Sequence, residues 1–597
     1  YKIGSAEFTL TDETGKTVQT KTADLTGQTS WSIMLDPVES PSGRYKLSVT
    51  SEGNEYASLS DIVFEDMPLV KIGVCEYDGE KITVPVSVMA QDVSENIRAV
   101  AAEFSDDGKL IGLSQSYTEG VENDTEIELS YERKDELSDI ELFVWDDKMK
   151  PYCDSQYIYE NISGKLSAAP AGVTYDSAAI VWDKNAGENY TYEILQNGSV
   201  IGETENLYYV AEGLEADTIY SFEVRVKGSD SLGTIRVKTE KKGDVLNILD
   251  YGAEAGGKTK NTGAIQAAID ACPKNGTVVI PEGTFLTGAL TLHSDMTLYL
   301  DKGAVLHGTA RAEDYPMWDS RFEGWELKSY RSLINIGELD NEGGYVCRNV
   351  HIKGDGTISG GGSALAAVTG GTQDDTTKRM RGRLISIHNA QNVSISGITV
   401  QQPPSWMIHM VYSDRVSTYN VNFISNGVRN GDGWDPDSST NCMVFGSVFR
   451  TGDDCIAIKS GKNPEGNIIN RPTKHIRIFN CRTEETEGGS YSGLGMAIGS
   501  EMSGGVEDVT ITDCDIQGTR YGLEIKASPK RGGYVKNINV KDSTFDRLLM
   551  HSVSYNDDGE AAPDMPYFSD MVFENVTVPG YENYNGKKAL NTSIELI

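Results

Sequence analysis

The sequence predicts an all-β chain in which three small β-sandwich domains precede a right-handed parallel β-helix. Short runs of alternating apolar and polar residues recur along the whole chain, as in half-buried strands. Glycine is abundant, with 62 of 597 residues, and phenylalanine is scarce, with 14. In the C-terminal part the β-runs return every 23 to 34 residues or so, a spacing typical of a solenoid whose coils bury their faces by stacking.

The N-terminal strands divide into two sandwich domains, which we place at residues 1–69 and 70–158. Runs at 6–10 and 45–49 represent the first domain, and runs at 82–88 and 140–145 the second. Turns rich in Gly, Asp and Pro separate them, which is the pattern of a small antiparallel sandwich. Neither domain contains a group of residues that indicates catalysis.

Residues 163–241 resemble a fibronectin type III module. A strand at 178–182 ends on Trp182, and the dipeptide Asn197-Gly198 predicts a tight hairpin turn. The run at 214–226 resembles the late strands of such a module, in which Tyr220 would be the corner tyrosine. We expect a spacer or binding platform.

The β-helix is expected over residues 244–597. It begins with one short helix at 264–270, which has helical spacing of its apolar residues and would cover the otherwise exposed end of the stacked sheets. Apolar runs behind small polar residues then mark successive coils, at 392–395, 415–418, 475–478, 508–511, 537–540 and 571–573.

Five aspartates lie among glycines between residues 430 and 459: Asp432, Asp435, Asp437, Asp453 and Asp454. Asp and Gly are also ordinary turn residues, so each one alone is compatible with a simple turn. In a solenoid, however, residues one coil apart stack on the same face at about 4.8 Å. Carboxylates held so close repel each other, which raises at least one pKa and suits a general acid. Adjacent aspartates point to opposite faces of a regular strand, so a bulge or turn is expected at Asp453-Asp454 if both are used.

With these motifs the segment from 244 to 597 resembles glycoside hydrolase family 28, the polygalacturonases, which have the pectin-lyase-like β-helix. Asn430-Gly431-Asp432 resembles the Asn-Thr-Asp motif of the family, and Gly452-Asp453-Asp454-Cys455 matches its Gly-Asp-Asp motif. The segments 435–438, 499–505 and 530–533 resemble the bacterial exo-acting branch, and 404–409 resembles the coil that borders the substrate.

The resemblance implies inverting hydrolysis of an α-glycosidic bond without a metal or other cofactor. Asp453 would be the general acid, and Asp432 with Asp454 would activate the attacking water. Substrate-binding residues expected from the motifs and their neighbours are Asn430, Lys526, Glu524, His409, Trp434 and Arg531.

Two positions depart from the family pattern. Gly-His-Gly is replaced by Gly493-Leu494-Gly495, and the Arg-Ile-Lys that binds a uronate carboxylate is replaced by Glu524-Ile525-Lys526. Glu524 reverses a charge, so a carboxylate beside it would be repelled. We therefore expect an exo-acting, polygalacturonase-like enzyme with altered subsite specificity, a rhamnogalacturonan or xylogalacturonan hydrolase being the alternative.

Two other function classes remain open, a Ca-dependent pectate lyase-like enzyme and a non-catalytic glycan-binding solenoid. The formal charge of -36 argues against a nucleic-acid partner, and no apolar run is long enough to span a membrane. The expected partner is a pectic polysaccharide or oligosaccharide. The first residues carry no signal-peptide pattern, so we expect the chain to form part of a longer bacterial precursor that is secreted or attached to the cell surface. We expect the protein to be a monomer. Whether Cys75 and Cys153 pair stays open.

Overall fold

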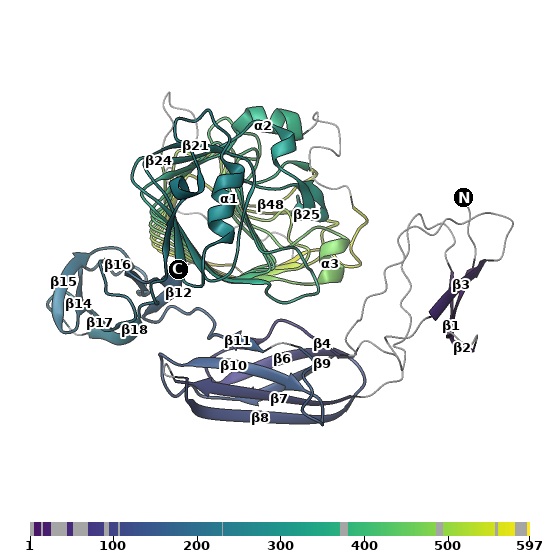
Figure 1. Ribbon diagram of the computed structural model, residues 1–597. Coiled ribbons are helices and arrows are strands. Elements are labelled where there is room, and N and C mark those ends of the chain that lie inside the picture. The colour runs from purple at the N-terminus through teal and green to yellow at the C-terminus, as the bar shows by residue number, and fades with distance from the viewer. Residues whose placement is uncertain are drawn as a thin grey trace. The chain divides into compact units, whose positions relative to one another are not determined.

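The chain forms two compact units, residues 1–160 and 161–597. The computed structural model (Figure 1) describes residues 5–12, 16–24, 45–51, 70–88, 95–105, 108–153, 155–229, 231–370, 380–484, 493–555, 559–578 and 594–596. Its three α-helices, α1 (Thr262–Asp270), α2 (Gly362–Thr369) and α3 (Glu465–Ile469), are all too short to cross a membrane.

The first unit consists of antiparallel sheets. One has the strand order β2-β1-β3, with β1 (Ser5–Asp12), β2 (Thr17–Asp24) and β3 (Tyr45–Ser51). Two further sheets enclose a core of aliphatic residues that includes Ile82, Val84, Ile97 and Leu142. Their strands are β4 (Val70–Ile72), β5 (Glu76–Tyr77), β6 (Lys81–Val88), β7 (Glu95–Phe104), β8 (Leu110–Val121), β9 (Thr125–Ser130), β10 (Asp139–Trp145) and β11 (Gln156–Ile158).

The second unit begins with a small sandwich of two antiparallel sheets, here called the module. Its strands are β12 (Ser167–Val173), β13 (Ser177–Val181), β14 (Tyr192–Gln196), β15 (Ser199–Thr204), β16 (Tyr208–Glu212), β17 (Ile219–Val226) and β18 (Ser231–Lys238). Trp182 is buried in its core, as expected from the sequence. The fibronectin type III assignment stays a prediction.

The module packs against the β-helix through aromatic rings. Tyr208 contacts Phe445 at 5.0 Å between ring centroids, and Phe445 stacks between Tyr419 and Phe479 at 4.9 and 4.8 Å. Its backbone is also held, because the Asn480 side chain accepts a hydrogen bond from Leu207 N at 2.8 Å. These rings share one buried cluster with the core of the module, so module and β-helix form a continuous hydrophobic contact.

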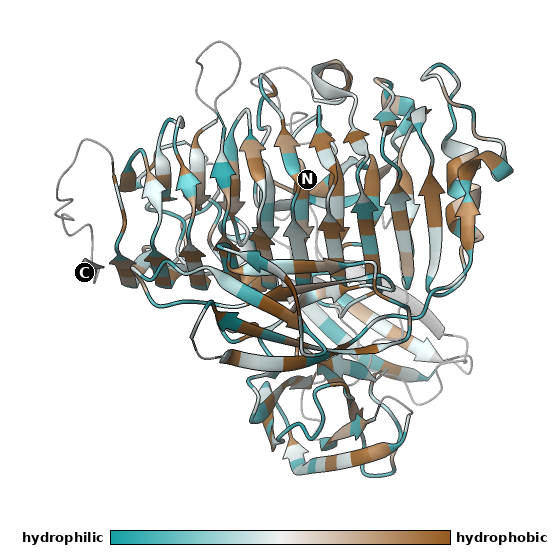
Figure 2. Ribbon diagram, turned by 90° about the vertical axis from the view of Figure 1, so that its left-hand side faces the viewer, coloured by the Kyte–Doolittle hydropathy of each residue, from teal (hydrophilic) through white to brown (hydrophobic). Residues whose placement is uncertain are grey.

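The remainder of the unit is a β-helix of three parallel sheets (Figures 1 and 2), so the predicted fold class is confirmed. The first sheet consists of β19 (Val245–Asn247), β20 (Gly276–Ile280), β23 (Met296–Leu300), β28 (Cys347–Gly354), β31 (Ala390–Ser396), β34 (Asp414–Tyr419), β37 (Thr440–Phe445), β40 (Thr473–Phe479), β43 (Val506–Thr512), β46 (Tyr534–Lys541), β49 (Tyr567–Glu574) and β50 (Ile594–Leu596). The second consists of β21 (Gly283–Thr287), β24 (Ala304–Gly308), β29 (Thr357–Ser359), β32 (Thr399–Gln401), β35 (Asn422–Ile424), β38 (Val448–Arg450), β41 (Arg482–Thr483), β44 (Asp515–Ile516) and β47 (Thr544–Phe545). The third consists of β22 (Leu290–Leu292), β27 (Ile334–Ile336), β30 (Ile385–His388), β33 (Ile408–Val411), β36 (Trp434–Asp437), β39 (Asp454–Ile458), β42 (Gly495–Ile498), β45 (Gly522–Ala527) and β48 (Leu548–Ser552).

The polar residues that precede the apolar runs have a structural reason. Asn392, Arg415, His475, Asp508 and Asn537 all have φ between 55° and 58°, the left-handed region. All five stand at the same register position of the first sheet, and Asn441, with φ of 51°, occupies that position on the intervening strand β37. Asn and Asp tolerate this conformation better than apolar residues do, which explains why polar residues recur there.

Helix α1 covers the first coils, as predicted. Its residues Ile265, Ala268 and Ile269 are buried in the core of the β-helix. An antiparallel hairpin of β25 (Met317–Phe322) and β26 (Trp325–Tyr330) is inserted between β24 and β27. Two 3-10 turns, η1 (Ile248–Tyr251) and η2 (Ala312–Asp314), complete the described elements.

Candidate active site

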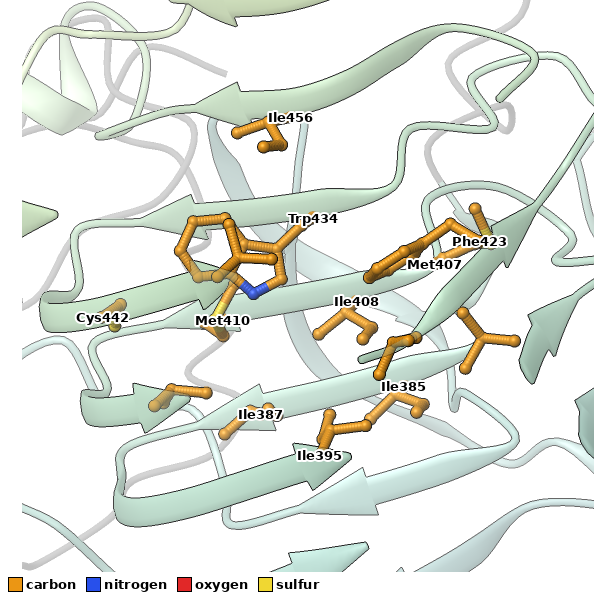
Figure 3. Close-up of a cluster of buried hydrophobic side chains, with 14 of the residues drawn as sticks. Ile385, Ile387, Ile395, Met407, Ile408, Met410, Phe423, Trp434, Cys442 and Ile456 are labelled. Carbon is orange, nitrogen blue, oxygen red and sulfur yellow. The ribbon is translucent and has the colours of Figure 1, made fainter. Parts of the chain in front are cut away.

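The aspartates lie on the third sheet, and strand parity decides which side chains face outward. Trp434, Ile408 and Ile456 stack in register and point into the core of the coil (Figure 3). The alternate residues therefore point outward: His409 on β33, Asp435 and Asp437 on β36, and Ala457 on β39. We call the outward side of β33, β36, β39, β42, β45 and β48 the site face.

Two outward rows cross the site face. One passes through Ala457, Ala497 and Glu524 on successive strands. The other leads from Asp437 to Lys459, whose backbones form an isolated β-bridge. It ends at Lys526 and His551, which are partners in the register of β45 and β48. The small side chains of Ala457 and Ala497 thus lie between β36 and Glu524 on β45.

Asp432 lies in the loop that enters β36. Its carbonyl accepts a hydrogen bond from Met407 N at 2.8 Å, which attaches the loop to the preceding coil. The neighbouring Asn430 adopts a left-handed φ of 50°, and its Oδ1 accepts a bond from the Arg381 guanidinium at 2.7 Å. The Asn430–Asp432 segment is therefore held from both sides.

Asp453 and Asp454 lie at a β-bulge, because the pairing register between β39 and β42 shifts between Asp454 and Ile456. This is the irregularity that the adjacent aspartates were expected to need. Leu494 N and the Thr451 hydroxyl both donate to the Asp453 carbonyl, at 3.0 and 2.9 Å. The Asp453 carboxylate itself accepts a bond from Asp454 N at 3.1 Å.

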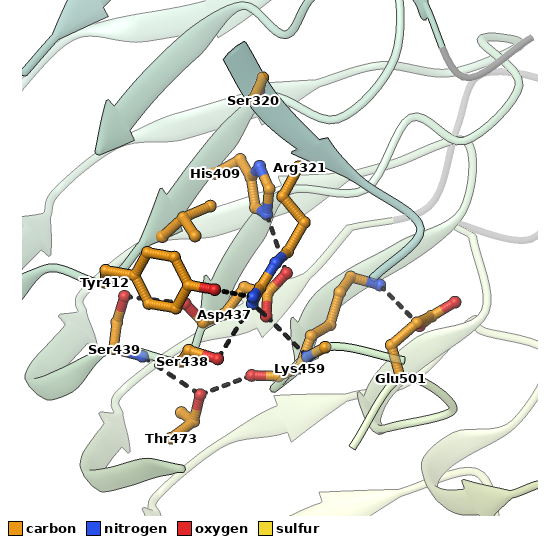
Figure 4. Close-up of polar contacts among 12 residues, drawn as sticks. Ser320, Arg321, His409, Tyr412, Asp437, Ser438, Ser439, Lys459, Thr473 and Glu501 are labelled. Carbon is orange, nitrogen blue, oxygen red and sulfur yellow. Dashed lines mark hydrogen bonds and ion pairs between the residues drawn. The ribbon is translucent and has the colours of Figure 1, made fainter. Parts of the chain in front are cut away.

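Two buried lysines each lie between two carboxylates. Lys459 Nζ is 3.5 Å from Asp432 Oδ2 and 3.7 Å from Glu501 Oε2, and it lies over the Trp406 ring (Figure 4 shows the contact with Glu501). Lys526 Nζ is 3.3 Å from Asp454 Oδ2 and 2.8 Å from Glu524 Oε2. Asp453 differs from Asp432 and Asp454, since none of the described residues forms an ion pair with it.

The electrostatics of the cluster favour bound protons. Burial raises the pKa of Asp432 and Asp435 well above the ordinary value, and repulsion from the neighbouring carboxylates adds to the effect. Burial also raises the pKa of Asp453, and it raises that of Asp454 to about 6, although both lysines oppose the shift. Four carboxyl groups thus share two lysine charges, so the cluster retains protons at a pH where isolated aspartates are ionised.

Asp437 belongs to a separate arrangement at the end of β36, which is centred on its ion pair with Arg321. Arg321 donates to its Oδ1 at 2.8 Å, and His409 Nε2 lies 3.3 Å from its Oδ2 (Figure 4). Although burial opposes ionisation, the Arg321 charge and the His409 contact hold the pKa of Asp437 at about 2. Burial lowers the pKa of His409 to about 4, so its ring is neutral at physiological pH.

Three residues expected to bind substrate have other positions. Trp434 is fully buried among apolar residues, and its Nε1 donates to Thr418 Oγ1 at 3.1 Å, so no ring face is left for a sugar. His409 is also fully buried and supports Asp437 instead. Arg531 is fully buried, donates to the Ser500 carbonyl at 2.7 Å and contacts Asn463, which fixes two loops. Asn430, Glu524 and Lys526 do lie beside the aspartates.

Inserted segments surround the carboxyl ends of β36 and β39. The hairpin β25–β26 places Phe322 against Trp406, with ring centroids 5.2 Å apart. Glu326 N donates to the Glu465 side chain at 2.7 Å, and Lys462 N donates to the Gly324 carbonyl at 3.0 Å. The Asn463 side chain in turn donates to the Glu560 carbonyl at 2.6 Å. Three segments far apart in sequence therefore join into one wall.

Four contributors to the site were not assigned from the sequence: Lys459, Glu501, His551 and Tyr555. Lys459 could have been found from the sequence. It follows Ala457 by two residues, so its side chain is expected on the same side of the sheet as that of Ala457. His551 and Tyr555 lie outside every motif, so only the fold brings them near Glu524. Within the described ranges, no three His, Cys, Asp or Glu side chains are arranged to hold a metal ion.

Comparisons with known proteins agree with this geometry. The model of a family described as "Glycosyl hydrolases family 28" matches residues 273–577. An exo-poly-alpha-D-galacturonosidase of Dickeya chrysanthemi is 28% identical over 495 residues, which cover 68% of this chain and 80% of that protein. A probable polygalacturonase of Vitis vinifera is 34% identical over 315 residues, 50% of this chain and 60% of that protein. The solved structure of a family 28 exopolygalacturonase of Yersinia enterocolitica is 25% identical with a TM-score of 0.65, and the match covers 72% of this chain and 90% of that one.

Proposed function

The chain belongs to family 28 of the glycosyl hydrolases, and we propose that it hydrolyses pectic polysaccharides from a chain end, with inversion at the anomeric carbon. The observation that carries the assignment of roles is the unequal pairing of the aspartates. Asp432 and Asp454 each form an ion pair with a buried lysine, whereas no lysine in the described part of the chain forms one with Asp453.

This pairing supports Asp453 as the general acid. Burial raises the pKa of all three aspartates, but an ion pair with a lysine at 3.3 to 3.5 Å favours the ionised form of Asp432 and of Asp454 against that shift. No described residue forms an ion pair with Asp453, so no contact as close opposes the effect of burial there, and the Asp454 N–H orients its carboxyl group. Asp453 would give its proton to the leaving glycosidic oxygen, while Asp432 and Asp454 take a proton from the water that attacks the anomeric carbon.

The wall of inserted segments supports action at a chain end. A polymer that continued in both directions would need an unobstructed path across the site face, and the joined hairpin and loops occupy the carboxyl-terminal side of it. The relatives from Dickeya chrysanthemi and Yersinia enterocolitica are both named as exo-acting enzymes. Because a polysaccharide does not cross membranes, we expect the protein to act outside the cytoplasm. That it acts as a monomer stays a prediction.

The roles are tested by Asp453→Asn, with Asp515→Asn on an exposed position of β44 as the control. We expect kcat on polygalacturonate to fall by about 10²- to 10⁴-fold in Asp453→Asn, the usual contribution of a general acid. The control should keep the wild-type rate, and circular dichroism should show the same fold for both. Chromatography of the wild-type digest should show a single small product from the start. A ladder of intermediate oligomers would contradict exo action, and an active Asp453→Asn would contradict the acid assignment.

A further inference from the structure

The charge of Lys526 is fully used within the protein. Its ammonium group lies between Asp454 at 3.3 Å and Glu524 at 2.8 Å, and all three side chains are buried. Burial alone would lower the lysine pKa, yet the two carboxylates raise it, so the ammonium stays charged. A charge shared by two carboxylates has little attraction left for a third.

The Glu524 carboxylate is also held in place from its other side. Its Oε1 is 2.6 Å from His551 Nε2, and the His551 side chain is 40% exposed. His551 is paired with Lys526 in the register of β45 and β48, so these two side chains form one short row with Glu524 beside it. The two carboxylates of Asp454 and Glu524 outnumber the single ammonium group of Lys526 that lies between them.

An exposed ring lies next to this row. Tyr555 follows β48, is 51% exposed, and lies near enough to Lys526 and Glu524 for both charges to act on its hydroxyl. The charges of Asp454 and Glu501 act on it as well. Aromatic rings offer a negative face to the C–H bonds of a pyranose, while Glu524 and His551 can exchange hydrogen bonds with hydroxyl groups.

We propose that the subsite formed by Glu524, Lys526, His551 and Tyr555 takes an uncharged, hydroxyl-bearing sugar rather than a uronate. This inference rests on the proposed hydrolysis of a pectic chain and specifies one position of that substrate. A uronate carboxylate that approached Lys526 would meet Glu524 and Asp454 at the same time, and like charges brought together oppose binding. A neutral sugar escapes that repulsion and keeps the stacking and hydrogen bonds.

The proposal is tested with two oligosaccharides that differ in one group. One is an oligogalacturonide, and the other is the same oligomer with the carboxylate next to the scissile bond reduced to a hydroxymethyl group. We compare kcat/KM for the wild type, Glu524→Arg and Glu524→Gln, with Glu205→Arg in an exposed turn of the module as a matched change of charge. Because Glu524→Gln keeps the shape of the side chain, it serves even if Glu524→Arg folds poorly.

The wild type and Glu205→Arg should prefer the reduced oligomer by about tenfold or more, and Glu524→Arg should shift the ratio by about 100-fold toward the uronate. Glu524→Gln should lie between them. Equal ratios in the wild type and both Glu524 variants would overturn the subsite proposal.

Calorimetric binding of both oligomers to Asp453→Asn provides a second readout that needs no turnover. Tighter binding of the reduced oligomer supports the subsite even if cleavage is absent, whereas tighter binding of the uronate overturns it. Absence of cleavage of both oligomers would count against the proposed hydrolysis, so the two failures are distinguishable.

Discussion

Replacing Lys459 by methionine should destabilise the acidic cluster, because this lysine acts on several of its carboxylates at once. Its ammonium group contacts Asp432 and Glu501 and also acts on Asp435 and Asp454. Methionine keeps the length and the contact with the Trp406 ring, so the variant removes mainly the charge.

The expected size of the effect follows from the two distances. At 3.5 and 3.7 Å and an effective dielectric constant of about 20, each contact contributes about 4 to 5 kcal/mol of Coulomb energy. Desolvation of the lysine offsets part of it, so we expect a loss of about 3 to 5 kcal/mol in the free energy of unfolding. The pKa of Asp432, already raised, rises further without Lys459.

The stability lost in Lys459→Met depends on pH. A carboxyl group whose pKa is higher in the folded than in the unfolded chain contributes most stability below its unfolded pKa of about 4 and loses this contribution as the pH rises. The stability difference between wild type and Lys459→Met should therefore be largest near neutral pH and smallest near pH 4. A water-activating Asp432 must be ionised, so the acid limb of kcat/KM should move to higher pH.

The assay combines urea unfolding at several pH values with a pH–rate profile on polygalacturonate. Lys459→Arg retains the charge and should keep most of the stability, and Lys536→Met removes a lysine that is 40% exposed on the first sheet. We expect Lys536→Met to change the free energy of unfolding by less than about 1 kcal/mol. A loss for Lys459→Met that is equally small, or a loss that does not depend on pH, would refute the reasoning.

Two further predictions concern Lys526 and the docked module. The rate should fall as the pH drops through about 6, where Asp454 takes up a proton. Lys526→Met should move this acid limb of the pH–rate profile to higher pH by about one unit, because Lys526 lowers the pKa of Asp454, and an unmoved limb would contradict the pairing. Phe445→Ala should lower the free energy of unfolding by about 3 to 5 kcal/mol, because its ring stacks between Tyr419 and Phe479 and also contacts Tyr208 of the module. Activity well below the melting temperature should persist, and unchanged thermal unfolding would show that the module is not held by these rings.

The fold was predictable because its signal is periodic. Each coil repeats a polar residue before an apolar run, and the left-handed φ of Asn392 or Asp508 shows that backbone geometry demands that polar residue. The acidic cluster was predictable for a related reason, because carboxylates one coil apart must stack.

Trp434 shows what the sequence leaves undecided. Next to Gly433 and Asp435 it was a candidate for sugar binding, and its register with Ile408 and Ile456 places it in the core. Which residues of β36 point into the core could only be decided once the strand pairing was known, because a shift of one residue moves every side chain to the other face. His551 could not be predicted, since its contact with Glu524 arises from the pairing of β48 with β45 and lies outside every sequence motif.

The anomeric form of the first product tests the central assignment most directly. Proton NMR of a digest, recorded before mutarotation, distinguishes α from β at the newly formed reducing carbon. Attack by a water held by Asp432 and Asp454, with Asp453 protonating the opposite side, predicts that the β anomer appears first from an α-linked chain. An α anomer at the earliest time, or an unsaturated product that absorbs in the near ultraviolet, would contradict it.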